Sequence, residues 1–227
     1  MRQSARIDPT RTALLLVDLQ EEQRPGQPYG VAGFETVLAN ARKLLAAARE
    51  RSLPVFHAAY RRDFDIVPPR PFEPLSTGGR PTFSDKSDPL TAICHEVAPQ
   101  PGELVIHKND ASAFADGSLT RALDEARTEW LFIAGVWTEA CVAASTRDAM
   151  AQGRRVILVK DACGSGTVAM HQVATLNIAN RLYGGMIAET AGALALMTGE
   201  PVETWTPERP VPIFFHLSDA ADHYERL

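Results

Sequence analysis

The stretch EWLFIAGVWTEACVAASTRDAM, residues 129–150, contains a complete strand-to-helix transition. Its first part, 129–135, is an apolar run that ends at Gly135 and has the length of a buried strand. From about residue 139 the apolar residues recur at spacings of three and four, which is typical of an amphipathic helix. Cys141 lies near the start of that helix. A strand followed directly by a helix is the repeating unit of α/β folds.

The same unit recurs along the chain. The expected strands are 12–18, 53–60, 103–108, 129–135, 154–162 and, less regular, 185–190. The expected helices are about 33–51, 88–98, 118–128, 139–152, 167–182 and 190–198. Alternation of this kind indicates a parallel sheet covered by helices on both faces. We therefore expect one domain over residues 1–227, folded as a three-layer α/β/α sandwich.

Two segments do not follow this alternation. Residues 60–85, YRRDFDIVPPRPFEPLSTGGRPTFSD, are rich in proline, glycine and arginine, and a long loop of this kind in a compact domain is usually a lid or a binding loop. The tail from about residue 200 carries Trp205, Phe214 and Phe215 beyond the last core element. We expect that tail to pack on a neighbouring subunit or on the surface of its own domain.

The composition excludes several classes of function. The 227 residues are 45% hydrophobic and 22% charged, as in an ordinary globular protein, and the net charge is −5 with scattered Lys and Arg. Such a charge distribution offers no basic surface for nucleic acid. No apolar run reaches the roughly 18 residues of a membrane helix, and the N-terminus is polar without an apolar segment of signal-peptide length. We expect a cytoplasmic protein without membrane or nucleic-acid partners.

Three chemically useful side chains stand where predicted strands end. Asp18 follows an apolar run directly, Lys108 closes another, and Cys141 begins the helix after a third. Ligands bind at the carboxyl ends of the strands in open parallel sheets, so these side chains are candidates for one site. A thiol at a helix start, beside an ammonium, is expected to have a lowered pKa and to act as a nucleophile.

These motifs resemble those of the isochorismatase-like cysteine hydrolases, a family that includes nicotinamidases and the N-carbamoylsarcosine, ureidoacrylate and biuret amidohydrolases. The resemblance covers about residues 10–198 and rests on ALLLVDLQ with Asp18, HKNDASAF with Lys108, and the segment from residue 133 with Cys141. It implies a six-stranded parallel sheet and an Asp18–Lys108–Cys141 catalytic triad. In the strand order of the family Lys108 starts two strands from Asp18, so we expect its loop to fold inward.

The resemblance also implies how a substrate would be held. A cis peptide bond is expected between Val136 and Trp137, where it would aim the backbone N–H groups of Trp137 and Cys141 at a developing oxyanion. By position, the expected substrate-binding residues are Gln23, Arg61, Phe114 and Trp137.

Departures from named subfamilies narrow the chemistry. Metal-binding nicotinamidases carry an Asp-x-His and a further His after the second strand, whereas this chain reads HAAYRRDFDI there, so no metal site and no cofactor are expected. Isochorismatases that cleave a vinyl ether typically have glycine where this chain has Cys141. The resemblance therefore favours cleavage of a carbon–nitrogen bond.

The remaining thiols and imidazoles are interpreted as structural. Cys94 and Cys163 lie in apolar surroundings and are expected to be inert core thiols. The histidines at 57, 95, 107 and 171 lack the spacing of a metal site. The Gly-Ser-Gly at 164–166 lacks the lysine of a phosphate-binding loop and is expected to be a turn.

The predicted function is hydrolysis of a small amide or ureido compound through a thioester on Cys141, with Asp18 as the proton carrier. Two alternatives remain open: hydrolysis of a non-amide bond on the same fold, and an inactive family member that serves as a binding or scaffold subunit. We also expect a homo-oligomer, a dimer or tetramer, because the tail adds apolar surface after the core is complete.

Overall fold

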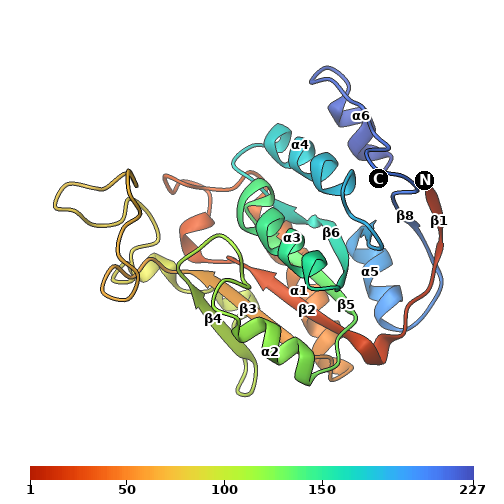
Figure 1. Ribbon diagram of the computed structural model, residues 1–227, viewed down its shortest axis with the longest axis horizontal. Helices are drawn as coiled ribbons and strands as arrows, with labels where there is room; N and C mark the ends of the chain where they lie inside the picture. The colour runs from red at the N-terminus through yellow and green to blue at the C-terminus, as the bar shows by residue number, and fades with distance from the viewer.

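A computed structural model describes all residues from 1 to 227. Its centre is one eight-stranded sheet with the order β1-β8-β7-β6-β5-β2-β3-β4 (Figure 1). The strands are β1 (Arg2–Ala5), β2 (Thr12–Val17), β3 (Val55–Tyr60), β4 (Leu104–Lys108), β5 (Trp130–Val136), β6 (Arg155–Gly164), β7 (Met186–Ala188) and β8 (Val202–Trp205).

The six strands from β7 to β4 are all parallel, as expected, but the sheet is larger than predicted. Two further strands extend it: β8 pairs with β7 and β1 pairs with β8, both antiparallel. The prediction of six strands was wrong because both additions are short and lie outside the repeating strand-helix units. Strand β1 is polar, and β8 belongs to the segment that the sequence analysis treated as a tail.

Helices cover both faces of the sheet. They are α1 (Phe34–Glu50), α2 (Ser118–Glu125), α3 (Ala143–Ala151), α4 (Val168–Ala179), α5 (Thr190–Met197) and α6 (Ala220–Glu225). Residues of α1 and α5 pack with one face of the sheet in a cluster of 27 buried apolar residues. Residues of α2, α3, α4 and α6 pack with the other face in a cluster of 26. The fold is the expected three-layer α/β/α sandwich (Figure 1).

The helix expected at 88–98 is absent. The chain forms two short 3-10 turns there, Pro89–Thr91 and His95–Val97, separated by extended backbone. Asp88 caps the first turn by accepting a hydrogen bond from the Leu90 N–H. Pro99 follows the second turn, and the residue before a proline disfavours the helical conformation. The apolar spacing that suggested a helix comes from residues such as Cys94 and Val97, which point into the core from these turns.

The C-terminal segment packs on its own chain. Trp205 is buried in β8, and α6 lies beside α4, with the terminal Leu227 also buried (Figure 1). Phe214 is largely exposed, whereas Phe215 packs against the core. The long loop between β3 and β4 extends away from the sheet at the end where β3 finishes (Figure 1). None of the helices combines the length and apolar character that spanning a bilayer requires.

Candidate active site

Three strands of the sheet deliver polar side chains to the same edge. Asp18 is the first residue after β2, Lys108 is the last residue of β4, and Cys141 lies in a single π-helical turn, Thr138–Val142, that follows β5. The strands are parallel, so their carboxyl ends lie together. This is the edge at which open α/β sheets bind ligands.

The three side chains are in direct contact through the lysine. The Nζ atom of Lys108 lies 2.9 Å from Oδ2 of Asp18 and 3.1 Å from Sγ of Cys141. The carboxylate and the ammonium are both buried, at 3% and 4% exposure, so each depends on the other for charge compensation.

The Lys108 side chain is long enough to reach Asp18 across the strand that separates them. Lys108 and Asp18 are separated by β3, which ends at Tyr60. The lysine crosses over that residue, with Nζ 4.6 Å from the centre of the Tyr60 ring. The expected inward fold of a loop is therefore unnecessary, because Lys108 itself belongs to β4 and its side chain spans the gap.

Backbone groups hold the carboxylate in place. Oδ1 of Asp18 accepts a hydrogen bond of 2.8 Å from the Tyr60 N–H, which also donates to Oε1 of Gln20. Gln20 donates in turn to the Tyr60 and Thr91 carbonyl oxygens. With one carboxylate oxygen bound to a backbone donor and the other to Lys108, Asp18 has a fixed orientation.

The thiol is neutral at rest, contrary to the expectation of a lowered pKa. The pKa of Cys141 is raised to about 12, mainly by burial and secondly by the Asp18 charge, and the nearby Lys108 ammonium opposes this rise without reversing it. Lys108 keeps its proton: burial lowers its pKa, but the charges of Asp18 and Cys141 raise it more. A thiolate formed by loss of the proton to solvent would leave two anions beside one cation, which explains why the pKa of Cys141 is raised. Transfer of the proton to Asp18 keeps a single anion and avoids that cost.

The turn that carries Cys141 is held close to β2. Gly135 has φ +129°, and a Cβ atom at this position would lie 2.0 Å from the Val17 carbonyl oxygen. Only glycine allows this approach, which places the end of β5 against the end of β2 just before Asp18. The next bond, Val136–Trp137, is cis as expected.

A cavity of about 310 Å³ opens beside the three side chains. It is lined by Asp18, Glu22, Gln23, Tyr29, Tyr60, Arg70, Phe83, Ser84, Asp110, Ala111, Trp137, Ala140 and Cys141. Of the residues expected to bind substrate, Gln23 and Trp137 are in this lining. They are linked by a hydrogen bond of 2.7 Å from Nε1 of Trp137 to Oε1 of Gln23, which fixes the indole ring.

Two expected substrate-binding residues lie elsewhere. Arg61 points away from the cavity, and its guanidinium donates to the Lys86 carbonyl oxygen at 2.8 Å. Phe114 is buried in the apolar cluster on one face of the sheet. Neither residue lines the cavity, because proximity in sequence to Tyr60 or Lys108 does not fix side-chain direction.

Glu22 and Arg70 also line the cavity, although neither is among the predicted substrate-binding residues. Glu22 follows Asp18 on the same short segment, so its position was a usable signal. It is buried at the cavity wall, where burial raises its pKa despite a hydrogen bond of 2.5 Å from Ser84. Arg70 lies in the long loop, where nothing in the local sequence separates it from the other arginines.

A buried arginine organises that loop. Arg62 is 1% exposed, and its guanidinium binds both carboxylate oxygens of Glu73 at 3.0 and 2.7 Å. Glu73 in turn accepts a hydrogen bond from the Arg70 N–H at 2.7 Å. The guanidinium of Arg70 lies 3.1 Å from Asp110, at the cavity wall. The loop thus presents an exposed cation at the cavity, linked through Glu73 to the buried Arg62.

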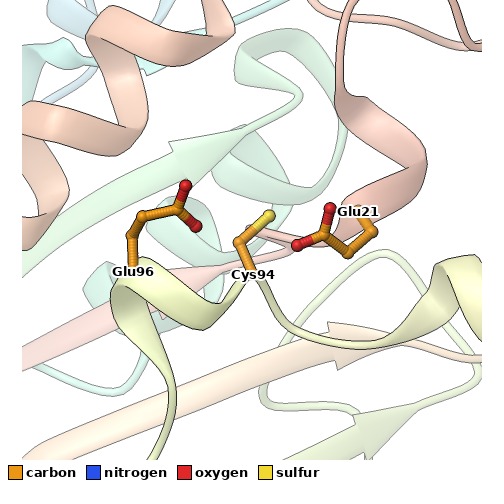
Figure 2. Close-up of side chains that lie close together, drawn as sticks. All are labelled: Glu21, Cys94 and Glu96. Carbon is orange, nitrogen blue, oxygen red and sulfur yellow. The ribbon is translucent and has the colours of Figure 1, made fainter.

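One group of side chains could in principle hold a metal ion. Glu21, Cys94 and Glu96 have their ligand atoms within 4.8 Å of one another (Figure 2). Arg24 already compensates this group, because its guanidinium lies 2.5 Å from Glu21 and 2.9 Å from Glu96. The residues fit a salt-bridge network better than a cation site, since a bound metal would have to displace the guanidinium.

Cys94, Cys163 and His57 do not line the cavity. Cys94 and Cys163 are buried, and burial raises the pKa of each thiol to about 12. His57 pairs with Glu103 at 3.0 Å near the amino end of the sheet.

Comparison with known proteins gives a consistent result. An isochorismatase domain matches residues 12–191. The chain is 33% identical to a maleamate amidohydrolase of Pseudomonas putida over 185 residues, which cover 78% of this chain and 83% of that protein. It is 31% identical to an N-carbamoylsarcosine amidase of Arthrobacter over 75% of this chain and 66% of that protein. A solved cysteine hydrolase from Pseudomonas syringae shares the fold, with a TM-score of 0.72, 20% identity, and coverage of 86% of this chain and 95% of that one.

Proposed function

The chain belongs to the isochorismatase family, and from this membership we propose that it is an amidohydrolase in which the thiol of Cys141 attacks the carbonyl carbon of a small amide or ureido compound. Relatives that carry amidohydrolase names place the chain among hydrolases of carbon–nitrogen bonds other than peptide bonds. The observation that carries the proposed mechanism is the contact of Lys108 with both Asp18 and Cys141.

The first half-reaction forms a thioester. Asp18 takes the proton of the Cys141 thiol while Sγ attacks the carbonyl carbon, and a tetrahedral intermediate results. Lys108 remains an ammonium throughout and stabilises whichever of the two groups carries the negative charge. Protonated Asp18 then delivers its proton to the nitrogen, the carbon–nitrogen bond breaks, and ammonia or an amine leaves.

The second half-reaction regenerates the thiol. Asp18, again a carboxylate, takes a proton from water while the water oxygen attacks the thioester carbon. Collapse of this second intermediate breaks the carbon–sulfur bond and releases the acid. The sulfur recovers its proton from Asp18, so one carboxylate serves both half-reactions and no external acid is needed.

The negative oxygen of each intermediate needs donors. We propose the backbone N–H groups of Trp137 and Cys141 for this role, since Trp137 directly precedes the turn that holds the nucleophile and Cys141 lies within it. The Trp137 N–H makes no hydrogen bond within the protein, which leaves it available to a substrate oxygen.

The cavity fits a small, flat substrate. Its volume of about 310 Å³ is at the small end of the usual range for ligand pockets. The ring of Trp137, fixed by Gln23, supplies an apolar wall, and Tyr29, Tyr60 and Phe83 supply another, with Phe83 between the two tyrosine rings at 5.4 and 5.5 Å. An acyl group of a few carbons packs between such walls.

The test is release of ammonia from a panel of small carboxamides, ureas and N-carbamoyl amino acids. Cys141→Ala should lower turnover by several orders of magnitude, since removal of a nucleophile elsewhere costs on the order of 10⁶-fold. Mass spectrometry of the acid-quenched reaction should detect the acyl group on Cys141. Cys141→Ala that keeps more than a few per cent of activity, or products without free ammonia or amine, would exclude this mechanism.

We also propose that the chain forms a homo-oligomer. Support comes from large apolar side chains exposed on the long loop and on the C-terminal segment, namely Ile66, Phe72, Phe214 and Leu217. Sedimentation velocity at micromolar concentration should give a dimer or larger species, and a monomer would contradict the proposal.

A further inference from the structure

A second group of polar side chains, buried except for one half-buried member, lies behind the turn that carries Cys141. Its members are Thr138, the first residue of that turn, His171 on α4 and Tyr224 on α6. The proposed mechanism uses none of them. Tyr224 also lies outside the matched isochorismatase domain, which ends at residue 191.

Hydrogen bonds join these three side chains in a row. Nε2 of His171 lies 3.0 Å from the Tyr224 hydroxyl, and Nδ1 lies 2.8 Å from Oγ1 of Thr138. Thr138 lies 2.9 Å from the Gly164 carbonyl oxygen at the end of β6. The row therefore connects the C-terminal helix to the nucleophile turn and to the sheet.

Only one direction of donation gives every proton an acceptor within the protein. If Thr138 donates to Gly164, then Nδ1–H of His171 must donate to Thr138, and Nε2 must accept from the Tyr224 hydroxyl. The reverse direction leaves the tyrosine proton without an acceptor within the protein. Burial lowers the pKa of His171 to about 4, with a further contribution from Lys160, so the ring is neutral as this arrangement requires.

The C-terminal helix is anchored independently at the same place. Nζ of Lys160, buried on β6, donates to the Tyr224 carbonyl oxygen at 3.2 Å and lies 4.6 Å from the centre of the Tyr224 ring. The rings of His171 and Tyr224 meet edge to face, with their centres 5.3 Å apart. Loss of the tyrosine hydroxyl alone would leave these contacts in place.

We propose that His171 and Tyr224 are positioning residues that fix the nucleophile turn through Thr138. The proposal rests on the proposed function, because it assigns the pair an effect on the chemical step. Thr138 is fully buried and directly follows Trp137, and Cys141 lies in the same turn. Holding the Thr138 side chain therefore limits the movement of both proposed oxyanion donors and of the sulfur.

The test compares three side-chain substitutions. Tyr224→Phe removes only the hydroxyl, and His171→Asn retains a donor near the Nδ1 position but cannot reach Tyr224. Both should lower kcat about ten-fold or more with KM nearly unchanged, since small displacements of reacting groups cost up to about a hundred-fold. His171→Ala, which also removes the hydrogen bond to Thr138, should lower kcat more than His171→Asn does.

Two controls separate positioning from general loosening. Tyr183→Phe makes the same chemical change at an exposed tyrosine and should leave kcat unchanged. Asn180→Leu removes the two hydrogen bonds between α4 and Ile213, which loosens the C-terminal segment without touching Thr138. It should lower the melting temperature with little effect on kcat.

A readout without substrate keeps this proposal apart from the proposed function. Hydrogen exchange of the backbone amides at 137–143 should be faster in Tyr224→Phe than in the wild type or Tyr183→Phe, with exchange elsewhere unchanged. If the wild type releases no ammonia, the proposed function fails while the exchange result still decides whether the turn is fixed by this pair. The proposal would be overturned if Tyr224→Phe and His171→Asn both kept wild-type amide exchange and wild-type kcat. It would also be overturned if the activity lost in His171→Ala were explained entirely by global unfolding.

Discussion

The ammonium of Lys108 lies 3.1 Å from the sulfur of Cys141, yet the pKa of that thiol is raised to about 12. Burial is the largest cause, and the Asp18 carboxylate adds to it, so one nearby cation does not produce a resting thiolate. The three groups are better described as a unit that holds one ammonium, one negative charge and one proton shared between sulfur and carboxylate.

This unit predicts the alkaline pH dependence. An isolated thiol would make kcat/KM rise through its usual pKa of about 8.5. Here the proton stays within the unit until far higher pH, because the Cys141 thiol remains protonated at every pH below its raised pKa. We expect kcat/KM to be flat from about pH 7 to pH 10. A rise with an apparent pKa between about 8 and 9 would show that solvent, not Asp18, removes the thiol proton.

The Asp18–Lys108 pair gives a prediction for stability. Lys108→Met leaves the Asp18 carboxylate buried without its cation, and breaking such a pair costs about 3–5 kcal/mol. Asp18→Asn together with Lys108→Met removes both charges, so the double variant should recover most of the lost free energy of unfolding. Neither variant should hydrolyse amides. Urea denaturation of the wild type, the two single variants Lys108→Met and Asp18→Asn, and the double variant measures the coupling, and additive losses would show that the pair is not compensated as described.

The contrast between Arg70 and Arg61 predicts a difference in specificity. Arg70 lines the cavity, whereas Arg61 is bound to Lys86 outside it. A charge-assisted hydrogen bond is worth about 1.5–3 kcal/mol, so Arg70→Met should raise KM for carboxylate-bearing amides about ten-fold or more. KM for neutral amides should change little. Arg61→Met is the matched control and should leave both unchanged; equal effects of the two substitutions would contradict the assignment.

The sequence was sufficient to predict the repeated strand-helix units and the polar residues at the ends of the strands. Alternating apolar runs identified all six parallel strands, and the positions of Asp18, Lys108 and Cys141 at strand ends identified the side chains that meet. The cavity wall was harder to predict, because Arg70 reaches it through Arg62 and Glu73, contacts that depend on how an irregular loop folds. Thr138, His171 and Tyr224 are far apart in sequence, and only the packing of α6 on α4 brings the last of them to the others.

The neutral state of His171 predicts how the protein responds to acid. Burial, and secondarily Lys160, lowers its pKa from the usual 6.5 to about 4 in the folded protein. The unfolded chain therefore binds a proton between these pH values that the folded chain does not, so folding is favoured above about pH 6.5 and loses stability as the pH falls towards 4. The shift corresponds to about 3 kcal/mol at most. His171→Asn cannot titrate, so its free energy of unfolding should fall less steeply than that of the wild type between pH 6.5 and pH 4.

Chemical denaturation across this range measures the difference, and His216→Asn, at an exposed histidine, is the control. Parallel pH profiles for wild type and His171→Asn would mean that His171 has the same pKa in the folded and the unfolded chain, and would contradict the lowered pKa.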